Sequence, residues 1–297
     1  MKITRRDFFK LTGAASASLL PEITQAESSG PEIDDAYSVL VDTGVCTGCR
    51  KCEWACNQEN KLTGKSRREF EDRSVLTTHR RPSGTAYTVI NGFPNEKAPD
   101  KTGYLKVQCL HCNRPACASA CIVGALRKSE SGPVTYDAWK CIGCRYCMVA
   151  CPFQIPAYEY ENPLDPRVMK CTFCVPRIQT GKPPACVEIC PSEVLTFGKR
   201  RDLLELAHLK ITKSPDMYVD HVYGEFEVGG TSWLYLASAD FARTELPRLG
   251  ADPIPERTEK IQHGIFKSFV PPLALYGILG LVMYTMRRDN QRQGSEE

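Results

Sequence analysis

The sequence has no strong imbalance of charge. Its 38 Lys and Arg residues nearly offset 35 Asp and Glu residues, so the formal net charge is only +3, and no basic run is long. A protein that binds nucleic acid through its phosphates needs a basic face, so the composition gives no case for that class. The hydrophobic share of 42% is ordinary for a globular protein.

The sequence also lacks the signature of a covalently attached haem. A c-type haem needs C-x-x-C-H, and no cysteine pair here is followed by histidine. The pair Cys109 and Cys112, for example, is followed by Asn113. This class of redox protein is therefore excluded.

Cysteine is what the chain has in excess. Sixteen cysteines, together with 21 Pro and 21 Gly, predict a loop-rich fold that needs support besides a hydrophobic core. The cysteines form four quartets, spaced C-x2-C-x2-C-x3-C, C-x2-C-x4-C-x3-C, C-x2-C-x2-C-x3-C and C-x2-C-x11-C-x3-C. In chain order these are Cys46, Cys49, Cys52 and Cys56; Cys109, Cys112, Cys117 and Cys121; Cys141, Cys144, Cys147 and Cys151; and Cys171, Cys174, Cys186 and Cys190.

This spacing has a physical reason in a [4Fe–4S] cluster. Three thiolates two residues apart let a tight loop surround one side of the cube, and the fourth thiolate then reaches the other cluster of a two-cluster unit. Pro152 and Pro191 follow the last cysteines of quartets three and four, as in bacterial ferredoxins. The sequence therefore predicts four [4Fe–4S] clusters.

Two other uses of cysteine compete with this interpretation. Zinc ribbons place two distant C-x2-C pairs around one ion, not three cysteines within seven residues. Disulfides suit an exported protein, but they would leave four repeated ferredoxin spacings as coincidence. Visible absorption and an iron assay separate these alternatives.

The cysteine order predicts an α+β fold. We expect two ferredoxin-like two-cluster units within residues 36–200: unit B, about 104–165, nested inside unit A, about 36–103 plus 166–200. Strands are expected at 38–41, 104–107, 133–137 and 195–197, and a helix at 201–209. Residues 57–101 are expected to form a surface insertion and residues 201–264 a C-terminal extension.

The N-terminus predicts export. Arg5 and Arg6, followed by Phe8 and Lys10 and a mild apolar run from Leu11, form a twin-arginine signal within residues 1–26. This route carries folded proteins, so clusters can be built before the thiols meet an oxidising compartment. The competing interpretation is a basic amphipathic N-terminus that stays in the cytosol.

The C-terminal region predicts a membrane anchor over residues 265–288. The eighteen residues from Phe269 to Met286 carry no charge, and as a helix they would be roughly 27 Å long. Arg287 and Arg288 follow directly, so the C-terminus is expected in the cytoplasm and the cluster region on the periplasmic side of the inner membrane. The alternative is a buried core helix.

The quartets carry a family resemblance. Residues 141–152 (CIGCRYCMVACP) and 186–191 (CVEICP) resemble the iron–sulfur subunits of DMSO reductase, formate dehydrogenase and related membrane oxidoreductases. Within them the chain is most similar to the HybA-type subunits of hydrogenase-2 type [NiFe] hydrogenases. The features shared with that type are the twin-arginine signal, residues 223–231 and residues 261–263 before one C-terminal helix.

The resemblance implies how the clusters are bound. Fourth ligands swap between quartets one and four and between quartets two and three. The implied sets are Cys46, Cys49, Cys52 and Cys190 (cluster 1); Cys109, Cys112, Cys117 and Cys151 (cluster 2); Cys141, Cys144, Cys147 and Cys121 (cluster 3); and Cys171, Cys174, Cys186 and Cys56 (cluster 4). Ile122 stands where the family usually has proline, which puts the local turn in doubt but not the cluster.

The resemblance also implies a function. The chain is expected to be a non-catalytic electron relay between the small and large subunits of a periplasmic [NiFe] hydrogenase and an integral-membrane quinone-reactive subunit. The alternative is the same relay in a molybdenum enzyme such as formate dehydrogenase or polysulfide reductase.

Some charged residues have two possible roles. Basic residues beside the thiolates either raise the cluster potentials or are solvated surface charges; they are Arg50, Lys51, Lys140, Arg145 and Lys170. His111 is predicted to be a neighbour of a cluster and not a ligand, and His263 to be an interfacial histidine or a contact of the membrane partner.

Overall fold

The computed structural model describes residues 33–95, 102–160, 167–256, 259 and 270–293. Two units are distinguished, one comprising residues 30–256 and the other residues 1–29 with 257–297. All sixteen cysteines lie in the first unit. The predicted twin-arginine signal, Phe269 and His263 lie outside the described residues.

A small sheet organises the first unit. Its central strand β1 (Tyr37–Asp42) pairs antiparallel with β8 (Leu195–Lys199) and parallel with β9 (Trp233–Leu236). Val39 lies opposite Phe197 on one side and Trp233 on the other. Strands β1 and β9 are almost fully buried and rich in Val, Leu and aromatic residues, as expected for strands covered on both faces.

The remaining strands form two-stranded ladders. Strand β2 (Thr88–Pro94) pairs antiparallel with β3 (Thr102–Gln108), β4 (Leu126–Lys128) with β5 (Val134–Tyr136), and β6 (Ala157–Tyr158) with β7 (Val168–Met169). The helices are α2 (Lys51–Glu59), α3 (Ala116–Ser119), α4 (Tyr146–Ala150), α5 (Val175–Gln179), α6 (Ala185–Glu188) and α7 (Arg200–Lys213). Short 3-10 turns are η1 (Ile33–Asp35), η2 (Thr43–Val45), η3 (Arg67–Phe70), η4 (Ser74–Thr77), η5 (Ala138–Lys140), η6 (Glu227–Gly229) and η7 (Phe241–Arg243).

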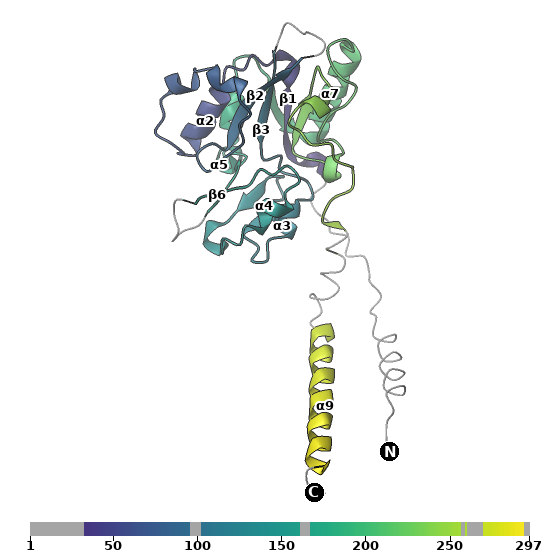
Figure 1. Cartoon of the computed structure of the whole chain (residues 1–297). Helices are drawn as coiled ribbons and strands as arrows, with labels where there is room; N and C mark the ends of the chain where they lie inside the picture. Colours follow the sequence, from purple (N-terminus) through teal and green to yellow (C-terminus); the bar gives the residue numbers. More distant parts are fainter. Residues whose placement is uncertain (1–32, 96–101, 161–166, 257–258, 260–269, 294–297) are drawn as a thin grey trace. The chain divides into compact units, whose positions relative to one another are not determined.

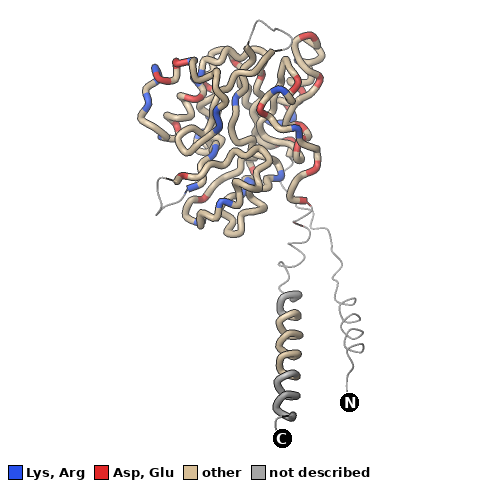
Figure 2. The backbone as a smooth tube through the Cα atoms, viewed as in Figure 1, with Lys and Arg blue, Asp and Glu red and all other residues tan. Residues whose placement is uncertain are grey.

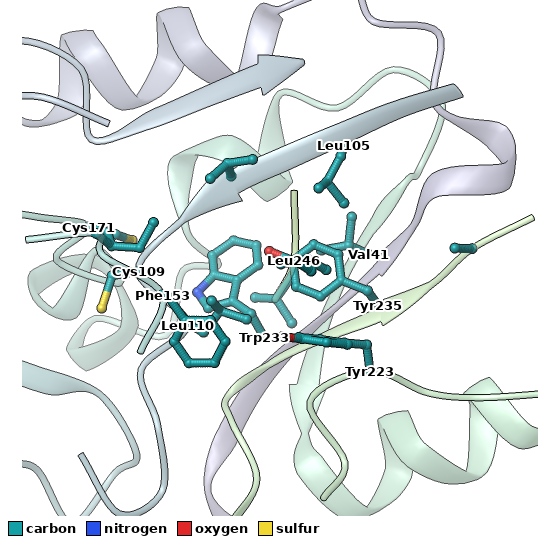
Figure 3. Packing of buried hydrophobic residues seen from close by; sticks show 14 of the residues in the cluster. Val41, Leu105, Cys109, Leu110, Phe153, Cys171, Tyr223, Trp233, Tyr235 and Leu246 are labelled. Carbon is teal, nitrogen blue, oxygen red and sulfur yellow. The ribbon is translucent and has the colours of Figure 1, made fainter. Parts of the chain in front are cut away.

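The main core lies between the sheet and the cysteine loops. Trp233 and Tyr235 of β9 are fully buried there, and the Trp233 ring meets Phe173 edge-on with ring centroids 5.8 Å apart. Figure 3 shows Cys109 and Cys171 at one edge of this cluster. The core therefore packs directly against cysteine-bearing segments.

Most predicted elements are confirmed as β1, β3, β5, β8 and α7. Leu203 of α7 packs into the core, whereas Leu209 is exposed. The predicted surface insertion at 57–101 is wrong in part, because β2 lies within it and Val89 and Ile90 are buried. The β-branched run of β2 is short and is flanked by polar residues, so the sequence pattern did not indicate a strand there.

The second unit contributes helix α9 (Val270–Gln293). Of the helices in the described part of the chain, none is both long enough and apolar enough to span a membrane. This finding does not support the predicted transmembrane anchor over 270–288, and residues 265–269 of that prediction lie outside the described part of the chain. The apolar stretch is interrupted by Tyr276, Tyr284 and Thr285, and beyond Met286 the helix continues into charged and polar residues.

Candidate iron–sulfur centres

The four cysteine loops share one unusual backbone feature. The residue just before the second cysteine of each quartet has a positive φ: 65° at Gly48, 50° at His111, 67° at Gly143 and 56° at Phe173. This left-handed conformation is uncommon for residues other than glycine. Its recurrence shows that the four loops turn in the same way, although their sequences differ.

Backbone N–H groups in these loops point toward sulfur. The N–H of Phe173 donates to Cys171 Sγ at 3.4 Å, and the N–H of Ala125 donates to Cys121 Sγ at 3.2 Å. Burial raises the pKa of the Cys46 thiol to about 11, while a hydrogen bond from the Gly48 N–H opposes this rise. Such donors stabilise a negatively charged sulfur, which is the state that binds iron.

The turn after the fourth cysteine is the same in three quartets. Residues Gly124, Gln154 and Glu193 each have a positive φ and each donate an N–H to the carbonyl of the cysteine three positions earlier. The backbone after Cys121 therefore forms the same turn as the backbone after Cys151 and Cys190, although Ile122 stands in the place of proline. The doubt about this turn is removed.

Short helices bring distant quartets together. Helix α2, which carries Cys52 and Cys56, packs against α6, which carries Cys186. Helix α3, which carries Cys117, packs against α4, which carries Cys147 (Figure 1). The first contact joins quartets one and four, and the second joins quartets two and three.

One pocket collects four thiols from two quartets. The cysteines that line it are Cys46, Cys49, Cys52 and Cys190. Gly48, Arg50, Lys106 and Pro191 also line this pocket. Cys190 belongs to the fourth quartet, so the fold brings it to the first loop.

The other thiols also gather across quartets. Burial raises the pKa of the Cys56 thiol well above its ordinary value, and the neighbouring Cys171, Cys186 and Cys174 add to the rise. Burial likewise raises the pKa of Cys112, followed by the influence of Cys109, Cys151 and Cys117. It raises the pKa of Cys147 to about 11, with further contributions from Cys141, Cys144 and Cys121.

Neighbouring groups of thiols are close enough to influence one another. The charge of Cys186 acts on Cys52, that of Cys109 on Cys171, and that of Cys147 on Cys117. Cys109 and Cys171 also lie next to each other in Figure 3. Thiols of quartet one therefore lie near those of quartet four, thiols of quartet four near those of quartet two, and thiols of quartet two near those of quartet three.

The donor set suits a cluster. All sixteen cysteines are free, and Cys144 is the exposed one. Among the described residues, no three Cys, His, Asp or Glu side chains converge as a single metal ion requires. In a cubane each thiolate binds a different iron atom, so convergence on one point is not needed.

The predicted basic residues have different surroundings. Arg50 is buried and paired with Glu53 at 2.8 Å, and Lys170 is buried and donates to the carbonyls of Val134 and Cys171. Lys51 lines the pocket of the first quartet. Arg50 and Lys170 are therefore not solvated surface charges.

The other two predicted cations are nearer the surface. Lys140 is exposed and pairs with Asp137 at 3.4 Å. The guanidinium of Arg145 lies over the rings of Tyr158 and Tyr160. Figure 2 shows basic and acidic positions interspersed along the backbone of this unit.

Two lysines close to the cysteines, the buried Lys106 and the partly buried Lys128, were missed by the sequence analysis. Lys106 in β3 lines the pocket of the first quartet, and Lys128 donates to the carbonyls of His111 and Cys112. Burial lowers the pKa of Lys128 to about 8. The available signal was a lysine within an apolar strand run, which is unusual unless the charge is compensated.

His111 is fully buried between the cysteine groups. Its Nδ1 accepts the N–H of Val134 at 2.9 Å, and its ring meets that of Phe173 at 4.9 Å. Burial lowers its pKa well below the ordinary value, helped by Lys170 and Lys128. The ring is therefore neutral and its Nδ1 is already occupied.

The fold and the four groups of thiols define an iron–sulfur electron-transfer protein of ferredoxin type. Residues 100–200 match the family model described as a 4Fe-4S dicluster domain. The chain belongs to the HybA family of iron–sulfur subunits: it is 32% identical to the hydrogenase-2 operon protein HybA of Escherichia coli O157:H7 over 99% of both chains.

The chain is also similar to other proteins. A protein of Nitratidesulfovibrio vulgaris is 44% identical over 99% of this chain and 79% of its own length. The formate dehydrogenase-O iron–sulfur subunit of Escherichia coli is 32% identical over 83% of this chain and 80% of its own length. The chain therefore binds several [4Fe–4S] clusters and serves as an electron relay in an oxidoreductase complex.

Proposed function

We propose that the chain is the non-catalytic subunit that carries electrons between a periplasmic [NiFe] hydrogenase, with its small and large subunits, and an integral-membrane quinone-reactive subunit. The main observation behind this proposal is that the four cysteine quartets lie in one unit, where each quartet has thiols close to those of another quartet. The full-length similarity to HybA supports hydrogenase as the electron donor.

The proposed ligand sets are the four crossed sets implied by the resemblance, arranged as two ferredoxin-like units, one nested in the other. The packing of α2 on α6 and of α3 on α4 supports this pairing. So does the pocket lined by Cys46, Cys49, Cys52 and Cys190. When bound, a [4Fe–4S] cluster accepts and releases one electron at a time.

The chain's own residues contribute the environment. Seven of the cysteines are buried and eight are partly buried, while Cys144 is exposed. Loop N–H groups stabilise thiolate charge, as at Cys171 and Cys121. Because Cys144 belongs to the last group of the row, that end provides an opening toward a redox partner.

Iron analysis and native purification test the proposal together. The anaerobically purified protein is expected to contain about sixteen iron and sixteen acid-labile sulfide ions, four for each cubane. It should co-purify with hydrogenase subunits, and native membranes should reduce quinone with hydrogen. About four zinc atoms in an active preparation would contradict the cluster assignment.

A molybdenum enzyme is the alternative electron donor. The similarity to the formate dehydrogenase-O iron–sulfur subunit supports this candidate. Quinone reduction with formate but not with hydrogen would favour it. The cluster chemistry would be the same in both complexes.

Export by the twin-arginine route is part of the proposal. Replacing both Arg5 and Arg6 with lysine is expected to leave a cluster-loaded protein in the cytoplasm, because this signal depends on the arginine pair. Fractionation with an iron assay of each fraction measures this. Normal periplasmic delivery of the double variant would remove the argument for this route.

A further inference from the structure

Lys106 is a buried cation at the centre of the cluster region. It lies in β3 opposite Ile90 of β2, and only 3% of the residue is exposed. Burying a lysine costs free energy unless its charge is compensated and its ammonium is hydrogen-bonded. The groups around the ammonium of Lys106 therefore indicate its role.

Neutral groups hold the ammonium in one place. Its Nζ donates to Thr88 Oγ1 at 2.8 Å and to Gln108 Oε1 at 3.0 Å, and it lies 4.4 Å from the centroid of the Trp233 ring. Gln108 is itself fixed, because its Nε2 donates to the Tyr235 hydroxyl at 2.6 Å. These contacts orient the charge but do not neutralise it.

The negative charges around Lys106 are thiolates. Within the described part of the chain, no ion pair joins it to a carboxylate. It lines the pocket formed by the first group of thiols, and the charges of four cysteines act on it: Cys186, Cys52, Cys171 and Cys56. One of these belongs to the cluster 1 set and three to the cluster 4 set.

We propose that Lys106 is an electrostatic tuning residue whose fixed positive charge raises the reduction potentials of clusters 1 and 4 together. This rests on the proposed function, since it requires both thiol groups to hold clusters. A cation stabilises the more negative, reduced form of a neighbouring centre, and the effect is strong where water is excluded. Lys106 keeps its proton throughout, because one electron is added and no bond to the lysine forms or breaks.

The test is an EPR-monitored redox titration of Lys106→Met, which keeps much of the side-chain length and removes the charge. Two of the four midpoint potentials are expected to fall, each by a tenfold change in the equilibrium constant or more, about 59 mV for one electron. Signals from clusters 1 and 4 are identified with Cys46→Ser and Cys56→Ser. Lys106→Arg should keep both potentials near those of the native protein.

A matched control is Lys128→Met, which removes the charge of a partly buried lysine beside Cys112 and Cys109. It should leave clusters 1 and 4 unchanged. If Lys106→Met does not load fully, Lys106→Gln gives the same test, because it keeps a polar group for Thr88 and Gln108.

Two results would overturn the inference: unchanged potentials in a fully loaded, uncharged variant, or an equal fall in Lys106→Arg. Iron analysis separates this failure from that of the proposed function. If the native protein contains no [4Fe–4S] clusters, the proposed function is wrong. If it contains four intact clusters whose potentials do not change when the Lys106 charge is removed, only the role of Lys106 is wrong.

Discussion

At the scale of single residues, buried charges support the cysteine loops. Glu53 on α2 lies between Cys52 and the hairpin strand β2, and it pairs with Arg50 at 2.8 Å and with Arg80 at 2.6 Å. It also accepts the N–H of Ile90 at 2.7 Å. One carboxylate thus joins the first cysteine helix to a strand and two arginines.

Glu53→Gln is expected to destabilise the protein by about 3–5 kcal/mol, since it leaves Arg50 inadequately compensated in a buried site. Thermal unfolding of the anaerobic, loaded protein measures the effect. Glu71→Gln is the control, because its pair with Arg67 is exposed and contributes about 0–1 kcal/mol. Equal losses for the two variants would contradict the assigned role.

Cys56→Ala tests the crossed ligand sets. It should alter the cluster held by Cys171, Cys174 and Cys186, because Cys56 lies with these thiols. EPR of the reduced variant is the measurement, with Cys46→Ala as the comparison. A change confined to the signal that Cys46→Ala alters would show that Cys56 serves its own loop.

At the scale of elements, β9 connects the sheet to the cluster region. Besides pairing with β1, it follows Thr231, which forms a bridge with Cys112, and Ser232, whose N–H donates to the Leu110 carbonyl. Trp233 then packs between Phe173 and Lys106. This segment fixes the second and fourth cysteine loops against a common support.

Trp233→Ala is expected to cost about 3–5 kcal/mol of stability through the cavity it leaves. Trp233→Phe should cost clearly less, because it fills most of the space and removes an indole N–H that is buried without a partner among the described residues. Chemical denaturation of the loaded protein compares them. A phenylalanine variant as unstable as the alanine variant would contradict this account.

The sequence predicts the cysteine groups and strands β1, β3, β5 and β8, because these signals are local: spacing and short β-branched runs. It does not predict that Trp233 to Leu236 pairs with a strand almost two hundred residues earlier, since a short apolar run does not specify its partner. Lys106 was missed for a similar reason. Its role depends on thiols from both ends of the cysteine region, which only the fold brings together.

At the scale of the whole molecule, residues 30–256 form a unit with its own core and all sixteen cysteines. A chain limited to these residues is expected to fold and to bind about sixteen iron atoms. Iron and sulfide analysis with visible absorption measures this after anaerobic cytoplasmic expression. Iron near eight would show that two clusters depend on residues outside this unit.

Because β1 is the central strand of its sheet, the sheet cannot form until both neighbouring strands have been translated. Its neighbours, β8 and β9, leave the ribosome long after it, and β9 follows the last cysteine, Cys190. Strand pairing between such distant segments is slow. Every cysteine loop is therefore translated before the sheet can close, which leaves an interval in which iron and sulfide can be delivered to accessible thiols. We therefore expect cluster assembly to begin before β9 pairs with β1.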